Sequence, residues 1–198
     1  PLLDGHKSTR TCILRAYATR HGPGPLVSED TFLTQRLDET HNVHNPWQGP
    51  MRVGWFDAVA TRYALAVVGG IENLALTCLD RLAGLPSLFI CDRYRYVGPS
   101  AADLTDFLVL GTAGEVVDLR HQSAPSLTRQ QRLTELLLHC RPVLRELAPI
   151  PHVRLPSGAI SPQAEAYVDE VRASIQQKRH TLICLSVGDK AQDKVWFD

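Results

Sequence analysis

The stretch Arg52-Val53-Gly54-Trp55-Phe56-Asp57-Ala58-Val59-Ala60-Thr61-Arg62-Tyr63-Ala64 decides how this chain folds. Gly54 stands directly before two large aromatic side chains, which predicts a tight turn of the backbone. Asp57 occupies the position of a helix N-cap, where a short carboxylate accepts hydrogen bonds from the free N–H groups of the first turn. The residues that follow, up to Gly69-Gly70, are apolar on nearly every side. They predict a helix that is buried all round in a sizeable domain.

Length and composition indicate a single domain over residues 1–198. The chain is 44% hydrophobic, which is enough to form a core. Its 21 basic residues balance its 21 acidic ones, so nothing favours nucleic-acid binding, which needs a basic surface. We expect no contact with a membrane, because no apolar run approaches the roughly 20 residues of a span and no signal-peptide pattern is present. The odd number of scattered cysteines favours reduced thiols in the cytoplasm.

Apolar runs along the chain predict an α/β fold, with a mostly parallel sheet flanked by helices. Ser161 and Pro162 have the residue types of an N-cap and a first helical position, so a helix should begin there. Leucines at helical spacing predict another helix, which Pro142 should kink or split near Arg141. The expected strands are 11–18, 73–79, 88–96, 181–187 and 195–198, the expected hairpin is 107–119, and the kinked helix is 129–147.

Two motifs resemble one known family. Gly54-Trp55-Phe56-Asp57-Ala58-Val59-Ala60 resembles the Gly-Trp-hydrophobic-Asp-x-Val-Ala signature of adenylosuccinate synthetases. Upstream, Arg15-Ala16-Tyr17-Ala18-Thr19-Arg20-His21-Gly22-Pro23-Gly24-Pro25 resembles that family's Ala-Tyr-x-Thr-Arg-Val-Gly-x-Gly-Pro segment. Two long motifs, in the right order and about thirty residues apart, make a specific match.

The resemblance implies a fold, a reaction and ligands. It implies a P-loop-like α/β fold and a homodimeric ligase that joins IMP to L-aspartate in purine nucleotide biosynthesis, with GTP and Mg²⁺. The similarity covers only the C-terminal part of the family. The family's glycine-rich phosphate loop, general-base aspartate and catalytic histidine have no counterpart in this sequence. We therefore assign no catalytic residue and no Mg²⁺ ligand.

Two loops resemble the family's guanine-binding elements. Thr77-Cys78-Leu79-Asp80 is similar to Thr-Lys-Leu-Asp, with Cys78 in place of the lysine, and Ser186-Val187-Gly188 is similar to a Ser-Thr-Gly loop that contacts the guanine carbonyl. A carboxylate such as Asp80 can accept two hydrogen bonds from guanine N1–H and the exocyclic amine, which adenine does not offer. We expect both loops at one rim of the sheet. Alternatively, Asp80 only caps the turn before Arg81.

Two further segments resemble the family's substrate-binding loops. By resemblance, His21 lies beside the IMP ribose, although it can equally be a solvated loop residue. The segment that contains Gln48 and Gly49 stands in place of the aspartate-binding loop. A guanidinium suits a dicarboxylate because it offers two parallel donors, and only Arg52 remains where the family has several arginines. Either another residue supplies the charge, the amine donor differs from aspartate, or the chain does not catalyse this reaction.

Three functions therefore stay open from the sequence. The chain is an adenylosuccinate synthetase-like ligase, a related ligase with a different amine donor, or a non-catalytic purine-nucleotide-binding protein. His41 and His44 are spaced like metal ligands, but no third ligand stands in register with them, so we assign no metal.

Overall fold

The computed structural model describes residues 9–37, 46–69, 71–122, 124, 126–175 and 181–197. Strands β1, β5 and β10 run parallel and are hydrogen-bonded in the order β1-β5-β10, and β11 adds an antiparallel strand beside β10. This sheet confirms the α/β fold class and the expected parallel pairing. Strand β1 is not buried as expected, because its five residues are exposed or half-buried. Its strands are β1 (Thr11–Arg15), β5 (Asn73–Thr77), β10 (Thr181–Ser186) and β11 (Lys194–Trp196).

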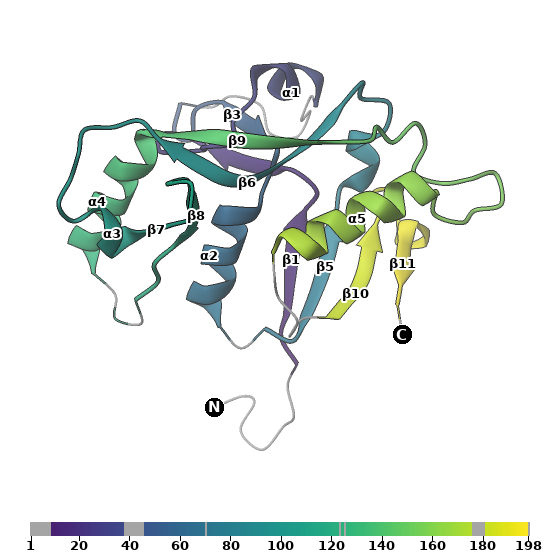
Figure 1. Ribbon diagram of the computed structural model, residues 1–198. Coiled ribbons are helices and arrows are strands. Elements are labelled where there is room, and N and C mark those ends of the chain that lie inside the picture. The colour runs from purple at the N-terminus through teal and green to yellow at the C-terminus, as the bar shows by residue number, and fades with distance from the viewer. Residues whose placement is uncertain are drawn as a thin grey trace.

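Helix α5 (Pro162–Ser174) lies across one face of the parallel sheet (Figure 1). The predicted start of the helix is confirmed, because the Ser161 hydroxyl accepts a hydrogen bond from the Ala164 N–H and Pro162 stands at the first position. The Tyr167 hydroxyl donates to the Ala16 carbonyl at 2.6 Å, which ties α5 to the end of β1. Apolar side chains between this helix and the sheet form the first hydrophobic cluster.

Helix α2 (Ala58–Val68) begins where the sequence predicts. Asp57 Oδ1 accepts a hydrogen bond from the Ala60 N–H at 2.9 Å, which confirms the N-cap. The prediction that the helix is buried all round is wrong. Val67 and Val68 are 49% and 56% exposed. The helix packs its other side against β6 and β8.

A second sheet is largely antiparallel, with the order β4-β6-β8-β7 and with β9 paired to β6. Only β4 runs parallel to β6, so the parallel pairs of the fold lie in the first sheet and at this one junction. The predicted hairpin is confirmed as the β7–β8 pair. The elements are β4 (Phe56–Asp57), β6 (Leu88–Tyr96), β7 (Leu108–Leu110), β8 (Val116–Leu119) and β9 (Cys140–Leu147).

The prediction of a helix over 129–147, kinked or split by Pro142, is correct for the first part of this range and wrong for the second. Helix α4 (Leu127–Leu138) ends before Pro142, and the chain then forms β9. Strand β9 pairs antiparallel with β6 from the Leu88–Leu147 pair to the Tyr96–Cys140 pair. In the described residues β9 has no other strand neighbour, and such an edge position tolerates proline. Pairing with β6 therefore overrides the helical leucine spacing.

The strand expected over 11–18 is divided at Ala16-Tyr17, and its second part, β2 (Ala18–His21), forms an antiparallel ribbon with β3 (Met51–Gly54). Gly54 is required here by close approach, because a Cβ atom at this position would lie 2.4 Å from the Ser28 carbonyl oxygen. The remaining elements are α1 (Thr31–Arg36), η1 (Leu79–Leu82), α3 (Leu104–Phe107) and η2 (Ala191–Asp193).

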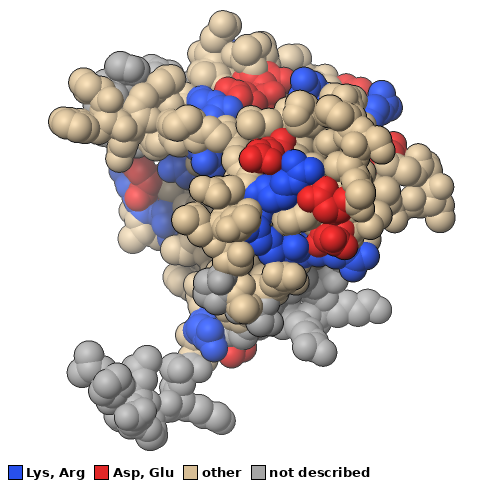
Figure 2. All heavy atoms as spheres, turned by 90° about the vertical axis from the view of Figure 1, so that its left-hand side faces the viewer, with Lys and Arg blue, Asp and Glu red and all other residues tan. Residues whose placement is uncertain are grey.

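The antiparallel sheet and α4 enclose a second hydrophobic cluster, which includes Val59, Tyr94 and Leu136. Basic and acidic side chains lie intermixed on the face that carries α3 and α4 (Figure 2). On α4, Arg132 pairs with Asp103 and with Glu135. Within the described ranges, no helix is long and apolar enough to cross a membrane.

Candidate functional site

The carboxyl ends of β1, β5 and β10 meet at one edge of the parallel sheet, because the three strands run in the same direction and are in register. Open parallel sheets place ligands at this edge. The loop that carries Asp80 follows β5, and the loop of Ser186, Val187 and Gly188 follows β10. The predicted meeting of these two loops at one rim is therefore present, and we call this region the strand-end rim.

The first loop of the rim is held in a constrained conformation. Cys78 has a φ of 62°, in the left-handed region that residues with a side chain seldom adopt. Leu79 is fully buried in the first hydrophobic cluster, so its side chain anchors the loop. Asp80 follows in the first turn of η1 and is half-buried. The loop thus presents a carboxylate from a fixed backbone.

Burial raises the pKa of the Asp80 carboxyl above its ordinary value, and the charge of Arg81 acts in the opposite direction. Two charged residues of the C-terminal segment also act on this pKa. The charge of Asp193 raises it, and the charge of Lys194 lowers it. The charges of η2 and β11 therefore lie close enough to η1 to act on Asp80.

The second loop is held by hydrogen bonds to its own backbone and to β11. The Ser186 hydroxyl donates to the Gly188 carbonyl at 3.1 Å. Lys194 Nζ donates to the same carbonyl at 2.7 Å and to the Lys190 carbonyl at 2.9 Å. A Cβ atom at Gly188 would lie 2.5 Å from Asp193 Oδ2, so this glycine allows the close approach of η2. The loop is therefore organised before any ligand arrives.

Sequence reasoning missed Asp193 and Lys194 as members of the rim. Lys194 pairs with Ser186 across the antiparallel β10–β11 pair, although eight positions separate them in the chain. No local motif marks this pairing. Only a correct prediction of the β10–β11 reversal would have placed Lys194 beside the loop.

The expected substrate residues gather around the β2–β3 ribbon, which follows β1 at the same edge of the sheet. His21 pairs with Met51 in the ribbon. Gly49 comes close to Gly22, because a Cβ atom on Gly49 would lie 3.8 Å from the Gly22 Cα. Gln48 is nearby, since its carbonyl oxygen would lie 3.0 Å from a Cβ atom on Gly22. The ribbon thus brings His21, Gln48 and Gly49 together.

Arg52 is engaged within the protein, which differs from the aspartate-binding role expected from the sequence. Its Nε donates to Glu29 Oε1 at 2.9 Å, and Nη2 donates to the second oxygen of the same carboxylate. Its Nη1 donates to the carbonyl oxygens of Gly22 and Gly24, at 3.0 and 2.8 Å. A guanidinium with these four hydrogen bonds fastens the glycine-proline loop to β3.

A buried carboxyl group lies under α2. Asp57 accepts hydrogen bonds from the Tyr94 hydroxyl at 2.7 Å and from the Ala60 N–H. Burial is the largest influence on this group and raises the pKa of Asp57 to about 6. Because Asp57 caps α2 and both partners are internal, these contacts are structural.

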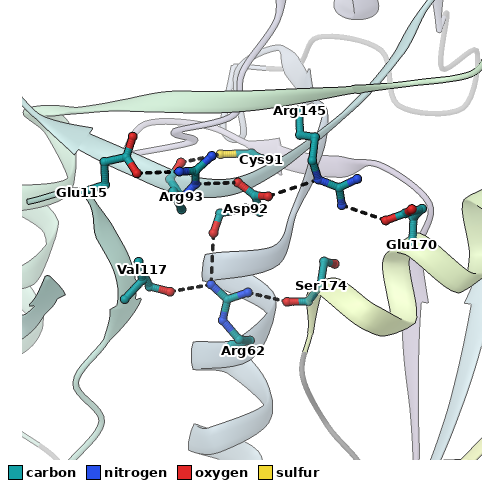
Figure 3. Close-up of polar contacts among 9 residues, drawn as sticks. All are labelled: Arg62, Cys91, Asp92, Arg93, Glu115, Val117, Arg145, Glu170 and Ser174. Carbon is teal, nitrogen blue, oxygen red and sulfur yellow. Dashed lines mark hydrogen bonds and ion pairs between the residues drawn. The ribbon is translucent and has the colours of Figure 1, made fainter. Parts of the chain in front are cut away.

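Arg62 forms the centre of a second polar cluster between the two sheets (Figure 3). Its guanidinium donates to the backbone carbonyls of Ser174, Asp92 and Val117, which belong to α5, β6 and β8. Around it, Arg93 pairs with Asp92 and Glu115, and Arg145 pairs with Asp92 and Glu170 (Figure 3). A cavity of about 320 Å³ is bordered by Arg62, Asp92, Arg93, Val117, Arg145 and Ser174 of this group. We call the whole group the Arg62 cluster.

Within the part of the chain that the structure describes, no group of three or more His, Cys, Asp or Glu residues is placed to hold a metal ion. His41 and His44, which the sequence spaces like metal ligands, lie outside the described residues.

Comparison with known proteins identifies the family. The family model for adenylosuccinate synthetase matches residues 5–136. The chain belongs to the adenylosuccinate synthetase family. An adenylosuccinate synthetase from Desulforudis audaxviator is 36% identical over 156 residues, which are 77% of this chain and 36% of that protein. Another, from Desulforamulus reducens, is 44% identical over 88 residues, which are 43% of this chain and 20% of that protein.

A solved structure supports the same fold. The fully ligated adenylosuccinate synthetase from Plasmodium falciparum superposes with a TM-score of 0.65 at 18% identity, and the match covers 94% of this chain and 39% of that one. The family assignment confirms the resemblance seen in the sequence. The chain spans little more than a third of the length of relatives that it matches over most of its own residues.

Proposed function

We propose that this chain carries the guanine-nucleotide-binding part of a GTP-dependent ligase that joins IMP to L-aspartate in the synthesis of AMP. The observation that supports this most is the strand-end rim in a member of this family, with Asp80 on one loop and Ser186 on the neighbouring loop. A cytoplasmic location and a homodimer belong to the same proposal, and both come from the family resemblance.

The chemistry of the rim suits guanine. The Asp80 carboxylate would accept hydrogen bonds from the N1–H and the exocyclic amine of the base. The loop of Ser186 and Gly188 would contact the carbonyl on the same ring edge. Adenine has no N1–H and no amine at that position, so the rim would select against it.

The residues of this rim suit a base, and we assign no Mg²⁺ ligand among the described residues. When bound, GTP supplies the phosphoryl group that activates IMP, and Mg²⁺ supports that transfer. In this proposal the phosphates and Mg²⁺ are held by residues outside those described, and the role of the rim is to bind and orient the base.

Calorimetric titration with GDP, IDP and ADP tests the proposal. IDP lacks the exocyclic amine, so the intact rim should bind GDP more tightly than IDP, and ADP most weakly. Asp80→Asn should weaken GDP binding by about 1–3 kcal/mol and reduce the preference for GDP over IDP. Asp189→Asn removes an exposed carboxylate from the neighbouring loop and should leave both affinities unchanged. An unchanged GDP-to-IDP ratio in Asp80→Asn would rule out this base pocket.

One observation favours a second candidate. Arg52 is bound to Glu29 and to two carbonyls, so the expected partner for the aspartate carboxylates is already engaged. A related ligase with a different amine donor fits this arrangement. An assay of GDP release with GTP and IMP, with and without aspartate, separates the candidates. Release that depends on aspartate supports the first, and release only with another amine supports the second. GDP binding without release under any amine supports a non-catalytic nucleotide-binding protein.

A further inference from the structure

The loop that follows β10 has one carbonyl that receives two hydrogen bonds. The Gly188 carbonyl accepts from the Ser186 hydroxyl at 3.1 Å and from Lys194 Nζ at 2.7 Å. The same ammonium donates to the Lys190 carbonyl at 2.9 Å. Lys194 belongs to β11, which pairs antiparallel with β10, and this pairing brings its side chain to the loop. One side chain of the neighbouring strand therefore fixes the backbone on both sides of Asp189.

The Ser186 hydroxyl has its proton engaged inside the loop. A hydroxyl carries a single proton, and that of Ser186 is donated to the Gly188 carbonyl. In this arrangement the hydroxyl has no proton left for the carbonyl of a base. The donors that remain on this loop are its backbone N–H groups.

Two of those N–H groups are available to a ligand. The Val187 N–H donates to the Asp193 carbonyl at 3.0 Å, and the Lys190 N–H donates to Asp193 Oδ2 at 2.9 Å. Within the described ranges, no protein group accepts from the N–H groups of Gly188 and Asp189. Gly188 is half-buried and Asp189 is exposed, so a ligand can reach this part of the backbone.

Lys194 controls the direction of one of these N–H groups. The peptide group between Gly188 and Asp189 is planar and trans, so its C=O and its N–H point in opposite directions. Its C=O is turned toward Ser186 Oγ and Lys194 Nζ. The Asp189 N–H therefore points away from both side chains, and it keeps that direction as long as the carbonyl is held.

The loop also lies beside the carboxylate of the rim. Strand β10 contacts η1, which carries Asp80. The charges of Asp193 and Lys194 act on the pKa of Asp80, so both residues are near it. The edge of guanine presents an acceptor at C6 next to two donors, at N1 and at the exocyclic amine. A backbone N–H beside a carboxylate has the complementary order of donor and acceptor.

We propose that Lys194 is a positioning residue for base recognition. It holds the peptide group between Gly188 and Asp189 so that the Asp189 N–H donates to the carbonyl at C6 of guanine. The two loops of the rim then recognise different atoms, because Asp80 binds the N1–H and the amine. This inference rests on the proposed function, since it takes a guanine nucleotide as the ligand of the rim.

Calorimetric titration at pH 7 with GDP, 6-thio-GDP and IDP tests the role of Lys194. In 6-thio-GDP a sulfur, which is a weak acceptor, replaces the carbonyl oxygen, and the amine is kept. IDP keeps the carbonyl and lacks the amine. Lys194→Met should weaken GDP binding about tenfold, because the N–H donor is no longer held in place. The preference for GDP over 6-thio-GDP should shrink, and the preference for GDP over IDP should stay at the wild-type value.

Three further variants separate this role from others. Lys194→Arg keeps a cationic donor and should restore most of the preference for GDP over 6-thio-GDP. Lys190→Met removes an exposed ammonium from the same loop but keeps its backbone carbonyl, so all three affinities should stay near wild type. Ser186→Ala leaves Lys194 bound to the Gly188 carbonyl, so that preference should fall by less than in Lys194→Met.

The inference is overturned if Lys194→Met keeps the wild-type preference for GDP over 6-thio-GDP, or if Ser186→Ala alone abolishes it. The first result would show that Lys194 only fastens the loop, and the second that the hydroxyl contacts the base directly. Each preference is a ratio within one variant, so a uniform loss of folded protein cancels. In both cases the base pocket stands if Asp80→Asn loses the preference for GDP over IDP. If the wild-type chain binds no GDP, the base pocket fails and this inference fails with it.

Discussion

The Arg62 cluster and the strand-end rim are two polar regions of the molecule that use charge differently. In the Arg62 cluster the guanidinium is buried and donates to three backbone carbonyls, while the surrounding arginines pair with carboxylates. At the rim, Asp80 is half-buried beside a loop that is bound to itself and to Lys194. A charged side chain whose hydrogen-bond partners all lie inside the protein stabilises the folded state. A charged side chain at an open edge of the sheet is available to a ligand. Four predictions test this contrast.

The largest effect should come from Arg62. Arg62→Met keeps an apolar stem but leaves the carbonyls of Ser174, Asp92 and Val117 without this donor. We expect the free energy of unfolding to fall by about 3–5 kcal/mol, since each unsatisfied buried group costs about 1–3 kcal/mol. Urea denaturation followed by circular dichroism measures it.

Arg93→Met is the matched control within the same cluster. Its side chain is 42% exposed, and exposed ion pairs contribute little, so we expect a loss below about 1 kcal/mol. Equal losses in the two variants would contradict a special role for the buried guanidinium.

Asp57 should make stability depend on pH. The folded state raises its pKa from the ordinary 3.8 to about 6, so the folded protein binds this proton more tightly than the unfolded chain does. This group therefore lowers stability as the pH rises from about 4 to about 6. Asp57→Asn keeps a capping oxygen without the ionisation, and should gain about 2–3 kcal/mol relative to wild type between pH 4 and pH 7. Urea denaturation across this range measures the difference, and parallel stability curves for the two proteins would refute it.

Arg52 tests whether the β2–β3 ribbon uses its charge for stability, as the Arg62 cluster does, or presents it to a ligand, as proposed for the rim. Arg52→Met removes the hydrogen bonds to Glu29, Gly22 and Gly24, so we expect a loss of about 1–2 kcal/mol. Amide exchange within residues 22–24 should accelerate. If stability and exchange stay at wild-type values, the guanidinium is free for a substrate and the sequence-based expectation is right.

Asp80 should have the smallest effect on stability. Asp80→Asn removes a carboxylate whose pKa is already raised by burial, so the free energy of unfolding should change by no more than about 0.5 kcal/mol. GDP affinity should fall in the same variant. A large loss of stability would show that Asp80 has a structural role, and the rim would then not differ from the Arg62 cluster in its use of charge.

Local signals in the sequence predict much of the fold. Asp57, Ser161 and Pro162 mark helix starts correctly because capping depends on residues within one turn. Strands β5 and β10 are recognisable because each contains a short apolar run. The position of Asp80 just after a strand is also predictable, because the apolar run before it marks the strand that ends at Thr77.

Features that depend on distant partners are not predictable in this way. The segment after Leu138 has helical leucine spacing, but pairing with β6 makes it a strand. Arg52 binds Glu29, which lies 23 residues earlier, and no local pattern announces that contact. Lys194 reaches the rim only through the reversal between β10 and β11. In each case tertiary contacts override or add to the local pattern.

The position of Arg62 makes the molecule a cooperative unit. Its guanidinium bonds to the carbonyl of Ser174, beside the first hydrophobic cluster, and to the carbonyl of Val117, beside the second. If either hydrophobic cluster opened, the buried guanidinium of Arg62 would lose hydrogen bonds to its carbonyl acceptors. Partial opening is therefore costly, and amides in both clusters should exchange through one shared global unfolding event.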